Sequence, residues 1–469
     1  MTNALWKSSA IELTRAIAAR EASAREAVQS VLERISQVNP RVNALTDVLT
    51  QDALAAAASA DQRQSAGQPL GPLHGVPITV KVNVDTAGLA TTDGVVALHD
   101  HRASTDSPLV SALRDAGAVI VGRTNTPAFS LRWFTDNDLH GRTLNPFDSA
   151  VTPGGSSGGA AVAVATGMGP IAHGNDYGGS IRYPAWACGV VGLRPTVGRI
   201  PSYKESARSE RGISSQLMSV QGPLARTVAD AGLAMQVMSR GSALDPGWVP
   251  APWQFLDAGK PFKVALFKQH AAYCADASVV SALEQAARWL VQAGCEVEEA
   301  QPPHFEEAAE LWRTLVYDDL RRGGLAAIET FGDAAVRANL RLTLEGRPAL
   351  DRDAYLDALA RRLTISRNWA LFFERYPVLL MPNSWERQFA VDSDTVSVDR
   401  MNHVIAAQSP LLGTAMLGLP GLSVPTGVDA GLPTRVQLVS WRFREDLLLR
   451  AGQAIEDAAS FSVLDHLPA

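Results

Sequence analysis

The N-terminal part of the chain repeats apolar residues with the period of a helix. Residues 9–21 and 23–38 each place apolar side chains three to four positions apart, which predicts two consecutive helices. Ser23 and Glu26 have the spacing of a capping box, in which both side chains bond to the backbone at the start of a helix. We therefore expect residues 1–50 to contain an N-terminal helical pair.

From residue 76 the pattern changes to apolar runs that alternate with helical segments. Residues 76–84 and 118–121 are apolar runs typical of buried strands, and the periodicity of 108–116 between them predicts a helix. Residues 262–300 repeat this strand, helix, strand order, whereas 305–375 is mostly helical. Strands that alternate with helices indicate an α/β fold.

The last part of the chain returns to strands and closes with a helix. The predicted strands and the final helix lie at residues 378–381, 421–424, 435–439 and 445–458. Length alone, at 469 residues, would allow two or three domains.

Composition and charge narrow the partners that the protein can have. Hydrophobic residues make up 46% of the chain and charged residues 19%, which is typical of a large packed core. A net charge of -6 without a basic tract disfavours nucleic acid and anionic membrane surfaces. Residues 1–7 lack the features of a secretory signal, and the apolar run 160–165 is too short to span a membrane. We expect a cytoplasmic protein that acts on a small molecule as a monomer or homodimer.

The cysteines and a histidine pair do not indicate a metal site. Cys188, Cys274 and Cys295 lie far apart and lack zinc-binding spacings, so we expect reduced, buried thiols. His99 and His101 flank an aspartate in a polar stretch, which favours a solvated loop over a zinc site.

A glycine-rich region over residues 148–201 contains two motifs that indicate chemistry. The first, Gly154–Gly159, reads Gly-Gly-Ser-Ser-Gly-Gly and directly precedes an alanine-rich helix, so it offers unpaired backbone N–H groups. A phosphate-binding loop would carry a lysine after its last glycine, where this chain has Ala160. A flexible linker would not be followed at once by a helix and a second motif.

The second motif, residues 176–184, contains a candidate nucleophile. Ser180 follows Gly178 and Gly179, and it does not lie in the Gly-x-Ser-x-Gly turn of the α/β-hydrolases. Two glycines before a serine allow successive N–H groups to turn inward, as stabilisation of a tetrahedral oxyanion requires.

A serine hydroxyl needs a base that takes its proton. His173 lies in an apolar stretch and is expected to be a packed structural histidine. Lys81 is embedded in an otherwise apolar strand, where a lysine is rare unless it is paired or functional. Burial lowers the pKa of a lysine and produces the neutral amine that can act as a base. The alternative is a lysine whose stem packs while its ammonium group reaches solvent.

Together these motifs resemble the amidase signature family, serine hydrolases with a Ser-Ser-Lys triad. The segment 154–195 is similar to the family signature throughout, and Ser156 and Ser180 are 24 positions apart, as in the family. Further segments that look like family blocks are 71–77, 122–125, 222–226, 420–425 and 444–448.

The resemblance implies a fold and a role for each motif residue. The fold would be one large α/β/α domain over residues 1–469, with a mixed, twisted central sheet covered by helices. Its parts would be the helical pair, a catalytic core, a variable and mostly helical substrate-side region, and a return to the central sheet, at 1–50, 70–230, 240–375 and 376–469. The resemblance also implies a cis peptide bond before Ser156.

By the same resemblance, Ser180 is the nucleophile and Lys81 is the base, which acts through Ser156. The backbone N–H groups that would hold the oxyanion are those of Tyr177, Gly178, Gly179 and Ser180. Side chains with a structural or orienting role would be Asp176, Arg182 and Ser157. This chemistry requires no metal and no organic cofactor.

Aromatic residues near the motifs and in the helical region predict a pocket for an apolar or aryl acyl group. The candidates are Trp133, Phe134, Tyr177, Trp186, Trp312 and Tyr317, although each could be an ordinary core aromatic. Asn125 and Thr152 are candidates for hydrogen bonds to substrate, with capping or turn roles as the alternative.

Other functions on the same scaffold remain open at this point. The glutaminase component of glutamine-dependent transamidases belongs to the family, but residues 337–352 do not look like its corresponding region, and 202–216 adds polar sequence near the site. Ester, carbamate and hydrazide hydrolysis would use the same residues. A binding protein without activity is disfavoured by the presence of all three triad residues.

Overall fold

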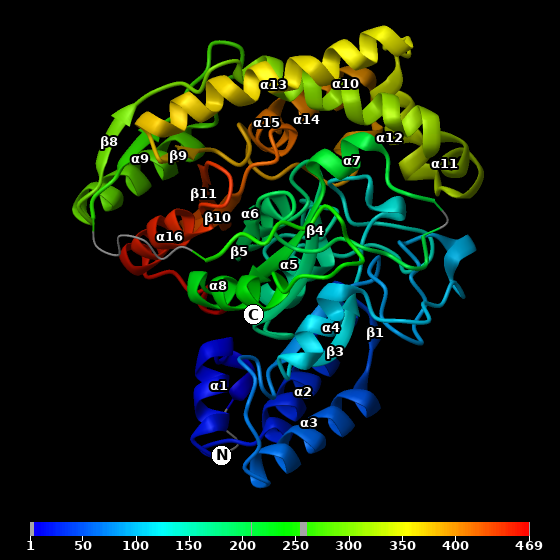
Figure 1. Ribbon diagram of the computed structural model, residues 1–469, viewed down its shortest axis with the longest axis vertical. Helices are drawn as coiled ribbons and strands as arrows, with labels where there is room; N and C mark the ends of the chain where they lie inside the picture. Colours follow the sequence, from blue (N-terminus) through cyan, green and yellow to red (C-terminus); the bar gives the residue numbers. More distant parts are fainter. Residues whose placement is uncertain (1–3, 208, 254–259, 469) are drawn as a thin grey trace.

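A mixed sheet of eleven strands forms the centre of the computed structural model, which describes residues 4–207, 209–253 and 260–468 (Figure 1). The strands are β1 (Leu45–Val48), β2 (Pro77–Lys81), β3 (Val119–Thr124), β4 (Ile171–Asp176), β5 (Val191–Arg194), β6 (Val220–Ala225), β7 (Lys263–Leu266), β8 (Glu296–Glu299), β9 (Val378–Met381), β10 (Gly421–Asp429) and β11 (Leu432–Ser440). Their order across the sheet is β1-β3-β2-β4-β6-β5-β10-β11-β9-β7-β8.

Apart from the edge strand β1, which is antiparallel to β3, the strand directions divide the sheet into two parallel groups with an antiparallel centre. Strand β2 pairs in parallel with β3 and β4, and β7 pairs in parallel with β8 and β9. Between these groups β4, β6, β5, β10, β11 and β9 pair antiparallel with their neighbours. The expected mixed α/β sheet is thereby confirmed.

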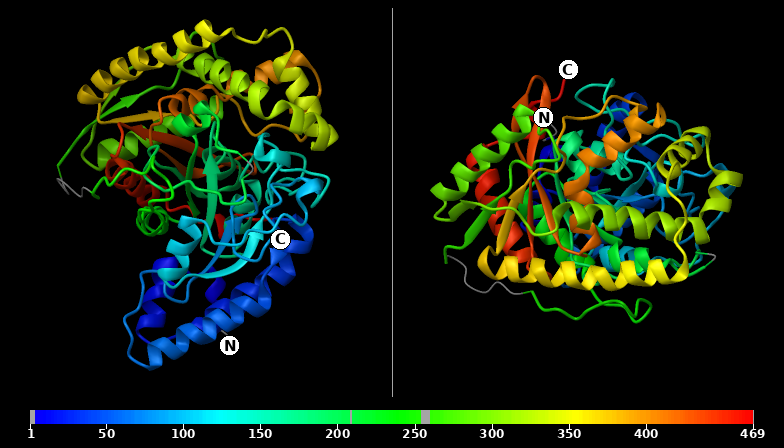
Figure 2. Two further views of the ribbon diagram at one scale, coloured as in Figure 1. Left: turned by 45° about the vertical axis from the view of Figure 1, so that its right-hand side comes forward. Right: turned by 90° about the horizontal axis from the view of Figure 1, so that it is seen from above.

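Helices cover the sheet and extend the molecule at both ends (Figures 1 and 2). The helices are α1 (Ala10–Ala18), α2 (Ala24–Val42), α3 (Thr50–Ser65), α4 (Pro108–Asp115), α5 (Gly158–Ala165), α6 (Arg182–Cys188), α7 (Ile213–Met218), α8 (Val228–Met238), α9 (Ala277–Gln292), α10 (Phe305–Gly323), α11 (Leu325–Phe331), α12 (Ala334–Leu344), α13 (Arg352–Arg375), α14 (Val398–Ala407), α15 (Ser409–Met416) and α16 (Glu445–Ala459). Helices α1 to α3 lie at one end of the molecule, and α10 to α13 lie at the opposite end (Figure 1).

The predicted helical pair at the N-terminus is confirmed, and its capping explains where it begins. Ser23 and Glu26 form the expected capping box at α2, and Ser9 and Glu12 form a second one at α1. Each box satisfies backbone N–H groups that would otherwise lack a partner at the helix start. Strand β1 follows this pair within the first fifty residues, where the sequence indicated only helices.

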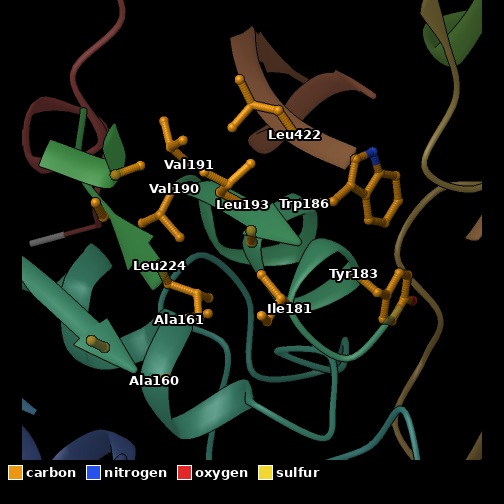
Figure 3. Packing of buried hydrophobic residues seen from close by; sticks show 14 of the residues in the cluster. Ala160, Ala161, Ile181, Tyr183, Trp186, Val190, Val191, Leu193, Leu224 and Leu422 are labelled. Carbon is orange, nitrogen blue, oxygen red and sulfur yellow. The ribbon is translucent and has the colours of Figure 1, made fainter. Parts of the chain in front are cut away.

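Helices α5 and α6 pack directly on the sheet and position the two glycine-serine motifs. All residues of α5 are buried, as expected for a helix that is apolar on every side, and it packs against β2, β4 and β6. Figure 3 shows Ala160 and Ala161 of α5 close to Leu224 of β6. Helix α6 packs against β5, β10 and β11. The rings of its residues Tyr183 and Trp186 stack with their centroids 5.4 Å apart (Figure 3).

Close backbone approach explains why glycines are frequent around the first motif. A Cβ atom on Gly155 would lie 2.4 Å from the carbonyl oxygen of Arg132, and one on Gly159 would lie 2.5 Å from the backbone nitrogen of Asn125. Neither backbone neighbour can move without displacing the strand or loop to which it belongs. Only glycine therefore lets the loop that carries Ser156 lie against the rest of the core.

The expectation for the cysteines is only partly confirmed. Cys188 is buried, Cys295 is half-buried and Cys274 is exposed, so the expected burial is wrong for Cys274. In the described parts of the chain, no helix combines the length and the apolar character that crossing a membrane requires.

Candidate active site

The sheet brings the predicted lysine and the two serine motifs to one place. Lys81 ends β2 and Asp176 ends β4, and these strands are parallel neighbours, so their last residues lie at the same edge. Ser156 lies in the loop that enters α5, and Ser180 lies in the turn between β4 and α6. The carboxyl ends of parallel strands are the usual place for the functional residues of α/β proteins.

Lys81 is fully buried and holds three polar contacts. Its Nζ lies 2.6 Å from Ser156 Oγ, 2.7 Å from Asn175 Oδ1 and 3.2 Å from Ser157 Oγ. The peptide bond between Gly155 and Ser156 is cis, as the sequence resemblance implied. Sequence reasoning missed Asn175, although it directly precedes the aspartate of the second motif.

Burial makes Lys81 a much stronger candidate base than an ordinary lysine. Desolvation lowers its pKa to about 7, against a smaller opposing effect from the charges of Asp93 and Asp176. A neutral amine has two N–H donors and one lone pair. Asn175 Oδ1 can only accept, and Ser157 Oγ donates its proton to the Asn175 carbonyl at 3.3 Å, so both accept from the lysine. The lone pair is then left for the hydroxyl of Ser156.

The turn that carries Ser180 presents several backbone N–H groups. Ser180 itself is 8% exposed, and its carbonyl accepts from the Ser157 N–H at 3.2 Å. The Gly179 N–H donates to Asp176 Oδ1 at 2.9 Å. Among the described residues, the N–H groups of Gly178 and Ser180 have no acceptor. Of the four amides expected to bind an oxyanion, that of Gly179 is thus already bonded to a carboxylate.

Two tryptophan side chains fix the orientation of this turn. Trp312 Nε1 donates to the carbonyl of Tyr177 at 2.7 Å, and Trp133 Nε1 donates to the carbonyl of Gly178 at 3.1 Å. A peptide plane whose carbonyl is held on one side points its N–H to the other side. The two indoles therefore determine where the N–H groups of Gly178 and Gly179 point.

A cluster of buried charged side chains supports the same turn. Asp176 Oδ2 lies 2.9 Å from Arg182 Nε, and Asp176 Oδ1 lies 3.0 Å from Arg194 Nη1, with all three side chains fully buried. Burial opposes ionisation of Asp176, but the charges of both arginines hold its pKa well below the usual range. This geometry supports the orienting role that we expected for Asp176 and Arg182. Arg194 also belongs to the cluster, although the sequence did not reveal it.

A cavity opens onto Ser180. Among the predicted pocket residues, Trp133, Tyr177, Trp312 and Tyr317 line it. Its other lining residues are mostly apolar and come largely from α10, α12 and the segment after β3: Ser130, Leu131, Arg132, Gly178, Val316, Leu320, Val336, Asn339, Leu340, Thr343 and Met401.

The remaining pocket candidates have structural positions outside this lining. Asn125 Nδ2 donates to the carbonyl of Gly141 at 2.9 Å, and Thr152 Oγ1 donates to the carbonyl of Trp133 at 3.2 Å. Phe134 stacks on a neighbouring phenylalanine in the core.

Trp186 lines a different, smaller cavity. Closeness to the motifs in sequence did not predict which of these side chains line the cavity that opens onto Ser180. The side chains that do not line it pack into the core instead.

The histidines behave as the sequence indicated. His173 is fully buried, its Nε2 lies 2.9 Å from Gln221 Oε1, and desolvation lowers its pKa to about 3, so it is neutral and structural. His99 is exposed, and His101 Nε2 bonds to a loop carbonyl at 2.7 Å. The described residues contain no cluster of three or more potential metal ligands.

Several known proteins are similar to this chain over most of its length. The sequence model of the family described as Amidase matches residues 26–449. Indoleacetamide hydrolase of Bradyrhizobium diazoefficiens is 43% identical over 98% of this chain and 88% of its own length. A component of the glutamyl-tRNA(Gln) amidotransferase of Salinispora tropica is 34% identical over 96% of both chains.

The fold is also that of solved enzymes of this type. A bacterial aryl acylamidase of the amidase signature enzymes superposes with a TM-score of 0.85 and 27% identity, covering 98% of each chain. The family match spans most of the sequence, and the relatives agree with it over nearly the whole length of the chain. The chain therefore belongs to the amidase signature family and is an amidase.

Proposed function

We propose that this amidase hydrolyses the primary amide of an arylacetamide such as indole-3-acetamide, through an acyl-enzyme on Ser180. Lys81 is the base and acts through Ser156. The observation that carries the proposal is the contact of 2.6 Å between Ser156 Oγ and the fully buried, weakly basic Lys81 Nζ. It is supported by the largely apolar cavity that Ser180 lines.

The first half of the reaction forms the acyl-enzyme. Ser156 gives its proton to the lone pair of Lys81 as it takes the proton of Ser180, and Ser180 Oγ attacks the amide carbon. The N–H groups of Gly178 and Ser180, which have no acceptor among the described residues, stabilise the oxyanion, and a donor of this kind contributes about 3 to 4 kcal/mol. The C–N bond then breaks, and the proton returns along the same side chains to the departing ammonia.

The second half releases the acid. Water attacks the acyl-enzyme and gives its proton to the same relay, after which Ser180 leaves as the alcohol and the arylacetate product departs. Every proton that Lys81 takes up is returned within the cycle. The three side chains are therefore restored to their starting protonation states at the end of each turnover.

The cavity supports an aryl acyl group as the substrate class. Its aromatic and aliphatic lining favours a flat apolar ring through burial of apolar surface and offset contacts between rings. The relative at 43% identity is named for hydrolysis of indoleacetamide, and the superposed structure is that of an aryl acylamidase.

The glutaminase function of the transamidases fits this cavity less well. Glutamine has a carboxylate and an ammonium group close to its amide, and each charge would need a partner inside the pocket. Arg132 is the only charged residue among the described lining residues, and its guanidinium is already paired with Asp394. The lining therefore favours an uncharged acyl group.

The test compares wild type with Ser180→Ala on indole-3-acetamide, phenylacetamide, glutamine and an aryl ester, with ammonia or acid release as the readout. We expect turnover of the arylacetamides by wild type and a loss of at least a thousandfold in the variant. A fluorophosphonate should label Ser180, detectable by mass spectrometry of the active-site peptide. Equal turnover by both proteins, or glutamine as the preferred substrate, would overturn the proposal.

A further inference from the structure

A buried ion pair lies beside the wall of the cavity that α12 forms. Arg132 Nε and Nη2 donate to Asp394 Oδ2 and Oδ1, both at 2.8 Å, and the two side chains are at most 1% exposed. Charged groups buried in this bidentate geometry are held in fixed positions. The pair is therefore a rigid anchor for any side chain that bonds to it.

Asn339 is anchored in this way and lines the cavity. Its Nδ2 donates to Asp394 Oδ2 at 3.0 Å. An ionised carboxylate only accepts hydrogen bonds, so the NH₂ group of the amide must face Asp394 and the carbonyl oxygen Oδ1 must face away from it. Within the part of the chain that the structure describes, no group donates to this Oδ1. The wall thus presents a fixed, unoccupied acceptor.

We propose that Asn339 Oδ1 accepts a hydrogen bond from a ring N–H of the substrate, so that the enzyme selects nitrogen heteroaromatic acyl groups such as indole. This inference rests on the proposed arylacetamide hydrolysis. An acceptor in an apolar cavity loses its hydration when a ring enters, and the loss is offset only if the ring donates a hydrogen bond. Carbocyclic rings of the same size leave this oxygen without a partner.

Other polar groups of the lining are less suited to the same role. Ser130 Oγ already donates to Asp93 at 2.6 Å and accepts from Asn83 Nδ2 at 2.9 Å. Thr343 is four residues after Asn339, on the same face of α12, and its buried hydroxyl interacts with the phenol of Tyr317. A hydroxyl can donate or accept, so it imposes no preference for a donor. Thr343 therefore provides a matched control.

The first experiment varies the substrate and leaves the enzyme as it is. The kcat/KM of wild type is measured for indole-3-acetamide, 1-methylindole-3-acetamide and benzothiophene-3-acetamide, the last of which has nearly the shape of indole without the N–H. We expect indole-3-acetamide to be preferred by about tenfold over both analogues, the size of one buried hydrogen bond. Equal kcat/KM for indole and benzothiophene would overturn the inference.

The second experiment assigns the preference to a residue. In Asn339→Leu we expect the indole to benzothiophene ratio to fall to about one, whereas Thr343→Val should keep the ratio of wild type. Retention of the preference in Asn339→Leu, or its loss in Thr343→Val alone, would contradict the role of Asn339. If Asn339→Leu does not fold, the substrate series on wild type still decides. Failure to hydrolyse any of the three amides would count against the proposed function itself.

Discussion

The amide oxygen of Asn175 lies 2.7 Å from Nζ of Lys81. An uncharged acceptor in this position orients the amine without favouring the ammonium form, which a carboxylate in the same place would do. Asn175 Nδ2 in turn donates to Asn83 Oδ1 at 3.0 Å, which fixes the orientation of the amide. The amine of Lys81 is thus held in place by neutral groups, which preserve its low pKa.

The activity of wild type should rise with pH through the pKa of Lys81. Burial lowers this pKa to about 7, and the amine is neutral, and therefore competent as a base, only above that value. We expect log kcat/KM for an arylacetamide to increase with a slope of about one below pH 7 and to level off above pH 8. A profile that is flat between pH 5.5 and 8.5 would show that a different group limits the reaction.

Replacement of Asn175 by aspartate should shift the rise of kcat/KM to higher pH. A carboxylate next to Lys81 Nζ stabilises the ammonium ion and raises its pKa by roughly one to three units. At pH 7 we expect kcat/KM to fall at least about fivefold, with recovery at higher pH. Asn175→Ala, which adds no charge, is the control and should leave the midpoint within about half a unit of wild type. Identical midpoints for wild type and Asn175→Asp would contradict the prediction.

The buried amine should also make stability depend on pH in a particular direction. In the folded protein its pKa is about 7, against 10.5 for an ordinary lysine, so the unfolded chain binds more protons between these values. The free energy of unfolding therefore gains up to about 1.4 kcal/mol per pH unit from this group as the pH rises. Lys81→Met lacks this contribution.

Urea unfolding of wild type and Lys81→Met at pH 7.5, 8.5 and 9.5 measures the difference in slope. We expect the advantage of the methionine variant to shrink as the pH rises. An advantage that stays constant over this range would mean that the lysine is not neutral in the folded protein.

Removal of the indole N–H of Trp312 should lower kcat more than it changes KM. Its hydrogen bond to the Tyr177 carbonyl orients the N–H group of Gly178, which we propose as a donor to the oxyanion. For Trp312→Phe we expect kcat to fall about tenfold, together with weaker binding of a trifluoromethyl ketone analogue. Trp369→Phe is the control, because Trp369 also makes a buried indole bond, to the Pro303 carbonyl at 2.6 Å, on a helix outside the cavity lining. Similar losses in both variants would indicate a general effect on folding.

Neutralisation of Asp176 should destabilise the fold strongly. Asp176→Asn leaves Arg182 and Arg194 buried without their counter-charge, and breaking a buried pair in this way costs about 3 to 5 kcal/mol. Asp115→Asn removes an ion pair with Arg240 in which both side chains are more than half exposed, and should cost under about 1 kcal/mol. Equal melting temperatures for the two variants would argue against the structural role of the cluster.

The amino-acid sequence by itself determined the fold class, most strands and helices outside the glycine-rich region, and the candidate base and nucleophile. Each depends on a local signal. A lysine inside an apolar strand is expected to be buried, and a serine after two glycines is expected to lie in a tight turn. Strand β9 was predicted with its observed ends, because its apolar run is short and sharply bounded. Strands β4 and β5 were missed because their apolar runs are interrupted by glycine or flanked by charge.

Only the tertiary structure decided which side chains surround the candidate active site. Arg132 and Asp394 are 262 positions apart, and Trp312 is 135 positions from the turn that it holds. Periodicity along a chain reports how deeply a residue is buried but not which residue it meets. For this reason Asn125 and Thr152, next to the motifs in sequence, lie outside the cavity lining, while Asn339, which no local pattern distinguished, lies on its wall.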